Sequence, residues 1–441
     1  MVNKSIFFSI IVQMFGFACN IGVIALLTRY LSKTEFGFFS IFVSVITVLV
    51  IIVTSSVSDL AVKEISTAKS QNNKRKMGEV AKYCCIVSLS IIFILSVFIL
   101  LIYFIDDSLT LSLSILIVLS VFGLSYITII GSMLRGLGFP IIGQTVSTVF
   151  FPSFFLAVII AGIFFPYQLS YSSGLDILLA RLISSFLGFF FVITVFLLLW
   201  KIKASNVFRS TFRTDWLHSS LEFLKIGFLG SFNRQASIYI LAFIATVAMV
   251  GEFRLVLLGL SVFEQISAVG LVLLQAKFAQ GKLPSKADEF NFEIFRIYGS
   301  IFLLSVLGLF IYIIFGKHLI VTIFGDGFAT VYWPLLIAIF GHVANLVFGP
   351  VGIFMTMRGY EKSVTRNLMI CVFLNLILST LLINYSGVAG AALGLVIGIF
   401  AFNSISIFSC RKKLLFNPSL ISATCNYLRS NKKKSTHEFN C

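Results

Sequence analysis

The sequence has little charge and few of the residues that break or crosslink a chain. Of its 441 residues, 11% are charged, 17 are Asp or Glu and 7 are Pro, whereas 59% are hydrophobic. This shortage of polar groups excludes a soluble globular protein and a disordered one, because too few side chains remain to face water. Lipid must therefore surround most of the chain, and the short connections between apolar runs leave no room for a separate soluble domain.

Residues that bind metals or form disulfides are also scarce and scattered. The four His lie in separate segments, and the seven Cys show no C-x-x-C spacing. Each Cys maps to a predicted helix or to the predicted cytoplasmic side, where disulfides are rare. We predict no metal site, no cofactor and no disulfide on the outside.

Long apolar runs are what the sequence does contain. A helix that crosses a hydrocarbon core of about 30 Å needs about 20 apolar residues. Breaking the chain at its charged and Gly/Pro clusters gives twelve such runs, so we predict an all-α polytopic membrane protein. The predicted spans are 6–28, 37–58, 83–105, 110–134, 140–164, 174–200, 223–250, 255–276, 297–316, 332–356, 364–384 and 388–409.

Lys and Arg in alternate connections give the orientation, because short positively charged loops are not translocated readily. With the N-terminus inside, 27 Lys or Arg fall on the cytoplasmic side and four fall outside, namely Arg29, Lys33, Arg254 and Lys317. The net charge of +16 is then a topology signal, and we predict no nucleic-acid partner. Both termini are predicted to be cytoplasmic.

An internal echo predicts two related halves. Met133-Leu134-Arg135-Gly136 closes the fourth span and Thr356-Met357-Arg358-Gly359 closes the tenth, which correspond if six helices repeat. We therefore expect about twelve helices in two pseudo-symmetric six-helix lobes around a central cavity. The expected divisions are 1–205, 206–410 and a basic cytoplasmic tail, 411–441, which we place at anionic lipid, with a cytoplasmic glycosyltransferase as the alternative contact.

Ionisable residues inside the spans are the candidate functional residues, because a charge at mid-bilayer costs about 2.5–3.5 kcal/mol or more. Arg234 lies near the middle of its span, on a face with Gly227, Gly230, Ser231 and Ser237. Arg181 repeats this pattern, with small residues on its own face at Ser184, Ser185 and Gly188.

Two interpretations of these residues stay open. In the first, Arg234, Arg181 and Arg29 line a water-filled cavity and hold phosphate groups through charge-assisted hydrogen bonds. In the second, the small residues are helix-packing faces and Arg181 reaches the headgroups. Glu264 in the next span is expected at the level of Arg234, where it is either a neutralising partner or an ion-coupling group.

The chain resembles the polysaccharide transporter family, the Wzx-type O-antigen flippases of the multidrug/oligosaccharidyl-lipid/polysaccharide exporter superfamily. The resemblance spans the whole length. It is carried by Leu26-Leu27-Thr28-Arg29-Tyr30-Leu31-Ser32 with Glu35-Phe36-Gly37, by Leu134-Arg135-Gly136-Leu137-Gly138, by Phe324-Gly325-Asp326-Gly327-Phe328 and by Ser386-Gly387-Val388-Ala389-Gly390-Ala391-Ala392.

This resemblance implies a flippase in the bacterial inner membrane, not an enzyme. Its expected substrate is an undecaprenyl-pyrophosphate-linked oligosaccharide, moved from the cytoplasmic to the periplasmic leaflet by alternating access with coupling to a proton or sodium gradient. Membrane lipids and polysaccharide assembly proteins are the expected partners. The alternatives are an organic-cation antiporter of the same superfamily, a peptidoglycan-precursor flippase and, in a different class, a membrane glycan polymerase.

Overall fold

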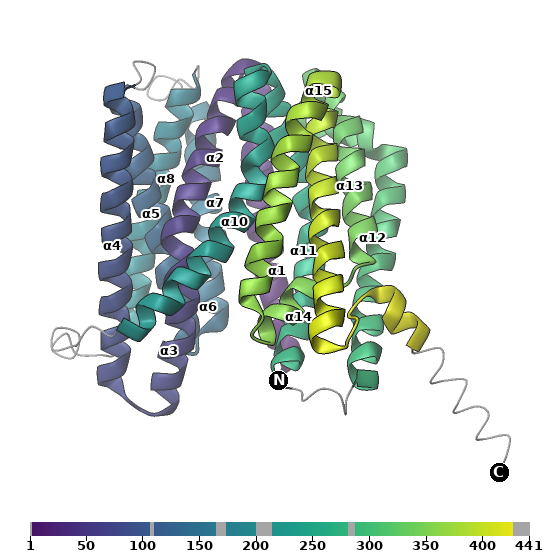
Figure 1. Cartoon of the computed structure of the whole chain (residues 1–441). Coiled ribbons are helices and arrows are strands. Elements are labelled where there is room, and N and C mark those ends of the chain that lie inside the picture. The colour runs from purple at the N-terminus through teal and green to yellow at the C-terminus, as the bar shows by residue number, and fades with distance from the viewer. Residues whose placement is uncertain (1, 106–109, 165–172, 200–213, 281–286, 427–441) are drawn as a thin grey trace, which may run out of the picture. The chain divides into compact units, whose positions relative to one another are not determined.

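The computed structural model describes residues 2–105, 110–164, 173–199, 214–280 and 287–426, and every regular element in these ranges is helical (Figure 1). Nine helices within them are long and apolar enough to cross a membrane. The prediction of an all-α, multi-pass membrane protein is confirmed. The chain forms two compact units, Met1–Ser231 and Phe232–Cys441, and the predicted division at 205/206 lies outside the described residues and stays a prediction.

The first unit contains the first six predicted spans. Their long helices form because branched and aromatic apolar residues follow one another with few interruptions, so that all backbone bonds are made within each helix. In chain order its elements are α1 (Val2–Tyr30), α2 (Lys33–Ser55), α3 (Ser58–Ser70), α4 (Lys74–Ile105), α5 (Leu111–Gly136), α6 (Pro140–Thr145), the π-helical turn η1 (Val146–Phe150), α7 (Phe151–Phe164) and α8 (Gly174–Leu199), followed by the first part of α10 (Thr214–Ile244).

The second unit contains the last five predicted spans and most of the seventh, 223–250. It comprises the rest of α10, α11 (Val247–Gln280), α12 (Ala287–Phe324), the 3-10 helix η2 (Asp326–Val331), α13 (Tyr332–Leu346), α14 (Val351–Met357) and α15 (Glu361–Leu414). The eleventh and twelfth predicted spans are the two halves of α15, which meet at a non-helical kink at Ser386 and Gly387. The seventh predicted span, 223–250, runs too far, because α10 ends at Ile244 and α11 begins at Val247.

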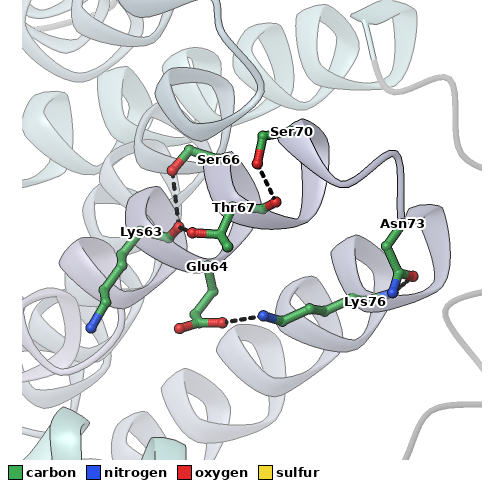
Figure 2. Close-up of polar contacts among 7 residues, drawn as sticks. All are labelled: Lys63, Glu64, Ser66, Thr67, Ser70, Asn73 and Lys76. Carbon is green, nitrogen blue, oxygen red and sulfur yellow. Dashed lines mark hydrogen bonds and ion pairs between the residues drawn. The ribbon is translucent and has the colours of Figure 1, made fainter.

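The connection predicted at 60–82 is a helical hairpin, not a loop. α3 has Asp59 in its first turn and Lys69 in its last, which suits the helix dipole. Figure 2 shows Glu64 of α3 paired with Lys76 of α4 at 2.8 Å. The side chain of Asn73 accepts a hydrogen bond from the backbone N–H of Lys76 at 2.9 Å and so caps the start of α4. The charges that mark a loop in the sequence here stabilise two helices.

In the first unit, a lysine fixes the turn between α5 and α6. The Nζ atom of Lys69 donates a hydrogen bond of 2.6 Å to the carbonyl of Leu137. The same ammonium lies 5.8 Å from the ring centroid of Phe139, which follows Gly138 with its φ of 83°. The bond satisfies a carbonyl that the end of α5 leaves free.

The second unit has a similar arrangement between α14 and α15. Here the Nζ atom of Lys413 donates to the hydroxyl of Ser363 at 2.5 Å and lies 5.4 Å from the ring centroid of Tyr360. Tyr360 also follows a glycine of positive φ, Gly359 at 80°. The two turns are those that the sequence echo pairs, so the resemblance between the halves extends to how each turn is held.

The helix break between α13 and α14 is covered by the segment that follows α15. Gly349 takes a φ of 69° at the break and Pro350 precedes α14. The N–H of Leu420 donates to the carbonyl of Val347 at 3.0 Å, and the ring of Phe416 lies 5.1 Å from that of Phe354. Part of the predicted tail, residues 415–426, is thus packed on the second unit.

We expect Leu420→Pro to lower the stability of the second unit by about 1–2 kcal/mol, because it removes the N–H that satisfies the Val347 carbonyl and part of the leucine packing. Leu420 is the first residue of its helical turn, where the backbone angle of proline is tolerated. Thermal unfolding of the purified protein in detergent measures the loss.

The control is Ile421→Ala, which changes an exposed side chain in the same turn and keeps the backbone N–H of Leu420. Equal unfolding temperatures for both variants would show that the segment does not stabilise the break.

Candidate functional site

The second unit holds an ion pair deep in its helices. The Nη1 atom of Arg234 in α10 lies 2.6 Å from the Oε2 atom of Glu264 in α11. The side chains are 43% and 32% exposed, so neither is enclosed by packing. The expected pairing of these residues is therefore observed, and a role for either in binding or ion coupling stays a prediction.

A second arginine belongs to the same site. Arg254 was expected in a connection between two spans, and this is wrong, because α11 begins at Val247 and Arg254 lies within it. Its placement on the outer side stays a prediction. Its guanidinium is within electrostatic range of Arg234 and of the Tyr239 ring. The charges of Arg234 and Arg254 therefore act on each other. The charged residues at 251–254 predict a loop, and for this reason Arg254 was not counted among the residues inside a span. The segment is helical in the structure.

A histidine borders the ion pair from α13. The Nε2 atom of His342 lies 3.0 Å from the hydroxyl of Ser267, and its ring lies edge-on to Phe263 at 6.4 Å. Ser267 is one helical turn from Glu264, so both point to the same side of α11. The charges of Glu264 and Arg234 both act on the imidazole. Sequence spacing alone gave no reason to join His342 to this site.

Next to Arg234, the neighbouring polar residues are used for packing. Asn375 of α15 is fully buried and donates to the backbone and side-chain oxygens of Asn233 at 3.0 and 3.1 Å. Ser379 donates to Asn375 at 2.8 Å and lies 3.2 Å from the hydroxyl of Ser237. These bonds join α10 to α15 and fix the part of α10 that carries Arg234.

Arg181 is in a different setting. Its guanidinium lies 4.8 Å from the ring centroid of Phe151 in α7, a cation–π contact. The small residues on its helix, Ser184, Ser185 and Gly188, are all buried, and Gly123 of α5 packs against Ser185. The stripe near Arg181 is therefore a packing face, as the second interpretation of the sequence expects.

Arg29 lies exposed in the last turn of α1. The next helix begins nearby, where Glu35 accepts a hydrogen bond from the backbone N–H of Gly174 at 2.5 Å and so joins the start of α8 to α2. The predicted cation set is thus spread over three helices, α1, α8 and α10, whereas the structure brings together Arg234 and Glu264.

Metal-binding side chains do not gather within the described ranges. No group of three His, Cys, Asp or Glu there is close enough to hold an ion, and the six cysteines that the structure describes are free. The candidate site of the second unit is the charged cluster of Arg234, Arg254, Glu264 and His342.

Comparison with known proteins gives the fold a context. No family model and no curated protein matches the chain. Several solved structures do. A MOP superfamily transporter from Pyrococcus furiosus has a TM-score of 0.67 at 14% identity, covering 93% of this chain and 95% of that one.

Two others are transport proteins as well. A multidrug resistance MATE family transporter in an inward-facing conformation has a TM-score of 0.64 at 14% identity, covering 92% and 98% of the two chains. The lipid II flippase MurJ has a TM-score of 0.61 at 14% identity, covering 92% and 87%. The chain therefore has the fold of MOP superfamily transporters, and these neighbours are transporters or a flippase, not enzymes. At this identity, the likeness says nothing about a substrate.

The geometry predicts that the ion pair contributes less to the free energy of unfolding than the buried asparagines do. For Arg234→Met and Glu264→Gln, a double-mutant cycle on thermal unfolding is expected to give a coupling energy below about 1 kcal/mol, because the pair is partly exposed. Asn375→Ala should cost about 1–2 kcal/mol, since it removes the two hydrogen bonds that Asn375 donates to Asn233 in a buried position. A larger coupling energy for the ion pair than the loss in Asn375→Ala would assign the pair a structural role.

Proposed function

We propose that this protein is a flippase for an anionic lipid-linked saccharide, of the undecaprenyl-pyrophosphate-linked oligosaccharide class. It moves the headgroup from the cytoplasmic to the periplasmic leaflet of the bacterial inner membrane. The fold supports a transporter, and the lipid II flippase is among the proteins that share it. The basic connections counted in the sequence support cytoplasmic termini.

The observation that carries the proposal is the excess of positive charge at the site. Arg234 and Arg254 lie within electrostatic range of each other, and Glu264 is the acidic partner of Arg234. With His342 neutral, the cluster has a net charge of +1. Such a cluster in a low-dielectric region is stabilised by an anion, and the planar guanidinium group matches a phosphate in two parallel hydrogen bonds.

The physical task explains why such a cluster would lie inside a helical membrane protein. A diphosphate and its sugar hydroxyls lose their water shell in hydrocarbon, at a cost of several kcal/mol for each unpaired polar group. Arginines that replace water around the phosphates remove most of this cost, while the polyprenyl chain stays in lipid. Arg181 and Arg29 remain candidates for the same cation set, and polysaccharide assembly proteins remain candidate partners.

A second candidate function is export of organic cations. The MATE family neighbour is named as a multidrug resistance transporter, and Glu264 is an acid that could hold a cation if it left Arg234. The two candidates differ in which residue they require. An anion carrier depends on the arginines, whereas a cation exporter depends on the carboxylate.

We expect Arg234→Ala and Arg254→Ala each to reduce surface polysaccharide and to raise the amount of lipid-linked repeat unit in the inner leaflet. The strain lacks the chromosomal gene and carries each variant at matched membrane levels. Loss of one charge-assisted hydrogen bond of about 1.5–3 kcal/mol corresponds to a fall in transport of about 10- to 100-fold.

Arg366→Ala is the matched control, because Arg366 is an exposed arginine in the first turns of α15. Export in Glu264→Gln should persist. If surface polysaccharide survives deletion of the gene, and Glu264→Gln instead abolishes resistance to cationic drugs, the organic-cation exporter is the correct function.

A further inference from the structure

The carboxylate of the ion pair, Glu264, has a second neighbour, His342, with which it could pair. Glu264 is bound to Arg234 at 2.6 Å, and its charge also acts on His342 across the α11–α13 interface. The hydrogen bond between Ser267 and His342 holds the imidazole on the side of α11 that carries Glu264. The carboxylate therefore has a guanidinium on one helix and an imidazole on another within its surroundings.

We propose that His342 is the alternative partner of Glu264, and that it takes up a proton when an anion replaces Glu264 on Arg234. The inference rests on the proposed anion site. In the free protein, Glu264 pairs with Arg234 and His342 is neutral. In the anion-bound protein, a phosphate oxygen pairs with Arg234, one proton from water binds to the imidazole, and Glu264 pairs with the resulting imidazolium.

The exchange follows from the cost of an unpaired charge. If the phosphate displaced Glu264 and nothing received it, an anion would stand beside the bound anion, and the repulsion between the two like charges would oppose the exchange. Histidine is the side chain whose ordinary pKa lies close to physiological pH, so it gains a proton at small cost when a carboxylate approaches. Net charge at the site is thereby balanced without a second mobile cation.

The other groups around His342 are compatible with this role. The charged residues that act on it are Glu264 of α11 and Arg234 of α10, and its contacts on α11, Phe263 and Ser267, are neutral. α15 faces α13 with neutral residues in these contacts: Val396 packs against Gly341, and Asn403 donates to Asn345 at 2.6 Å. From α12, the hydroxyl of Tyr312 donates to the Tyr332 carbonyl of α13. The positive charge of Arg234 disfavours a proton on His342 in the absence of the phosphate. A phosphate bound to Arg234 neutralises that charge.

The test is calorimetry of the full-length protein in nanodiscs with farnesyl-diphospho-glucose. Both phosphates of this probe are esterified, so the probe itself takes up no proton between about pH 6 and pH 8. Titrations in buffers of different ionisation enthalpy count the protons taken up on binding. Wild type is expected to take up a substantial fraction of one proton near neutral pH, and less at lower or higher pH, where the His342 imidazole is protonated or neutral in both states.

His342→Gln keeps a polar group opposite Ser267 and is expected to bind the probe more weakly with no proton uptake. Glu264→Gln has no carboxylate to transfer, so it should bind without proton uptake and at least as tightly as wild type. His318→Gln is the matched control, because His318 is an exposed histidine in α12, and it should behave as wild type.

The outcomes separate the two proposals. If wild type does not bind the probe, or if Arg234→Ala binds it unchanged, the proposed anion site fails and the exchange fails with it. If binding requires Arg234 but His342→Gln takes up as many protons as wild type, the anion site stands and His342 is not the alternative partner. Loss of proton uptake in both His342→Gln and Glu264→Gln, with binding retained, is the result that the exchange predicts.

Discussion

The backbone groups that a helix end or break leaves free need hydrogen-bond partners, and this constraint shapes the molecule where its helices are interrupted. At the break after α13, the Val347 carbonyl receives the N–H of Leu420 from a segment seventy residues later in the chain. At the end of α5, the carbonyl of Leu137 receives the ammonium of Lys69. At the kink in α15, the hydroxyl of Ser386 donates to the carbonyl of Leu382. Interruptions are allowed where another part of the same unit supplies the missing partner.

The same constraint limits where charge can lie. Arg234 is held next to an acid and beside a network of buried amides, so its position on α10 is fixed although its side chain is partly exposed. A lysine could not replace it equivalently, because an ammonium lacks the planar fork that binds a carboxylate and a phosphate alike. The shared geometry of these two anions is what makes an exchange between Glu264 and a phosphate physically simple.

Much of the fold could be predicted from hydropathy, because the length of an apolar run is set by the thickness of the bilayer. The errors lie where charge and helix coincide. The charges of α3 predict a loop, because its ion pair to α4 is a tertiary contact that hydropathy does not include. Arg254 was predicted to lie in a connection because Glu252 and Arg254 are charged, although both lie within α11. Hydropathy gives the average free energy of placing a charged side chain in the membrane. It contains no information about a partner side chain that lowers this free energy.

The candidate site was predictable in part for the same reason. The depth of Arg234 and Glu264 in adjacent helices was enough to expect their pairing, since both distances follow from the rise of a helix. Facing direction was not predictable: small residues near Arg181 pack against α5, and Ser237 packs against Ser379. A periodic stripe of small and polar residues occurs both on helix-packing faces and on faces that line a water-filled cavity. Only the position of the neighbouring helix distinguishes the two.

The two halves repeat their architecture without repeating their chemistry. Both have a lysine over the aromatic residue of the corresponding turn, at Phe139 and at Tyr360, so the repeat extends to how the turns are held. The arginines differ. Arg181 lies over a phenylalanine ring among buried small residues, whereas Arg234 has an acid, a second arginine and a histidine near it. The backbone groups of a turn need partners in both halves. The arginines are under no such requirement, so their surroundings can differ between the halves.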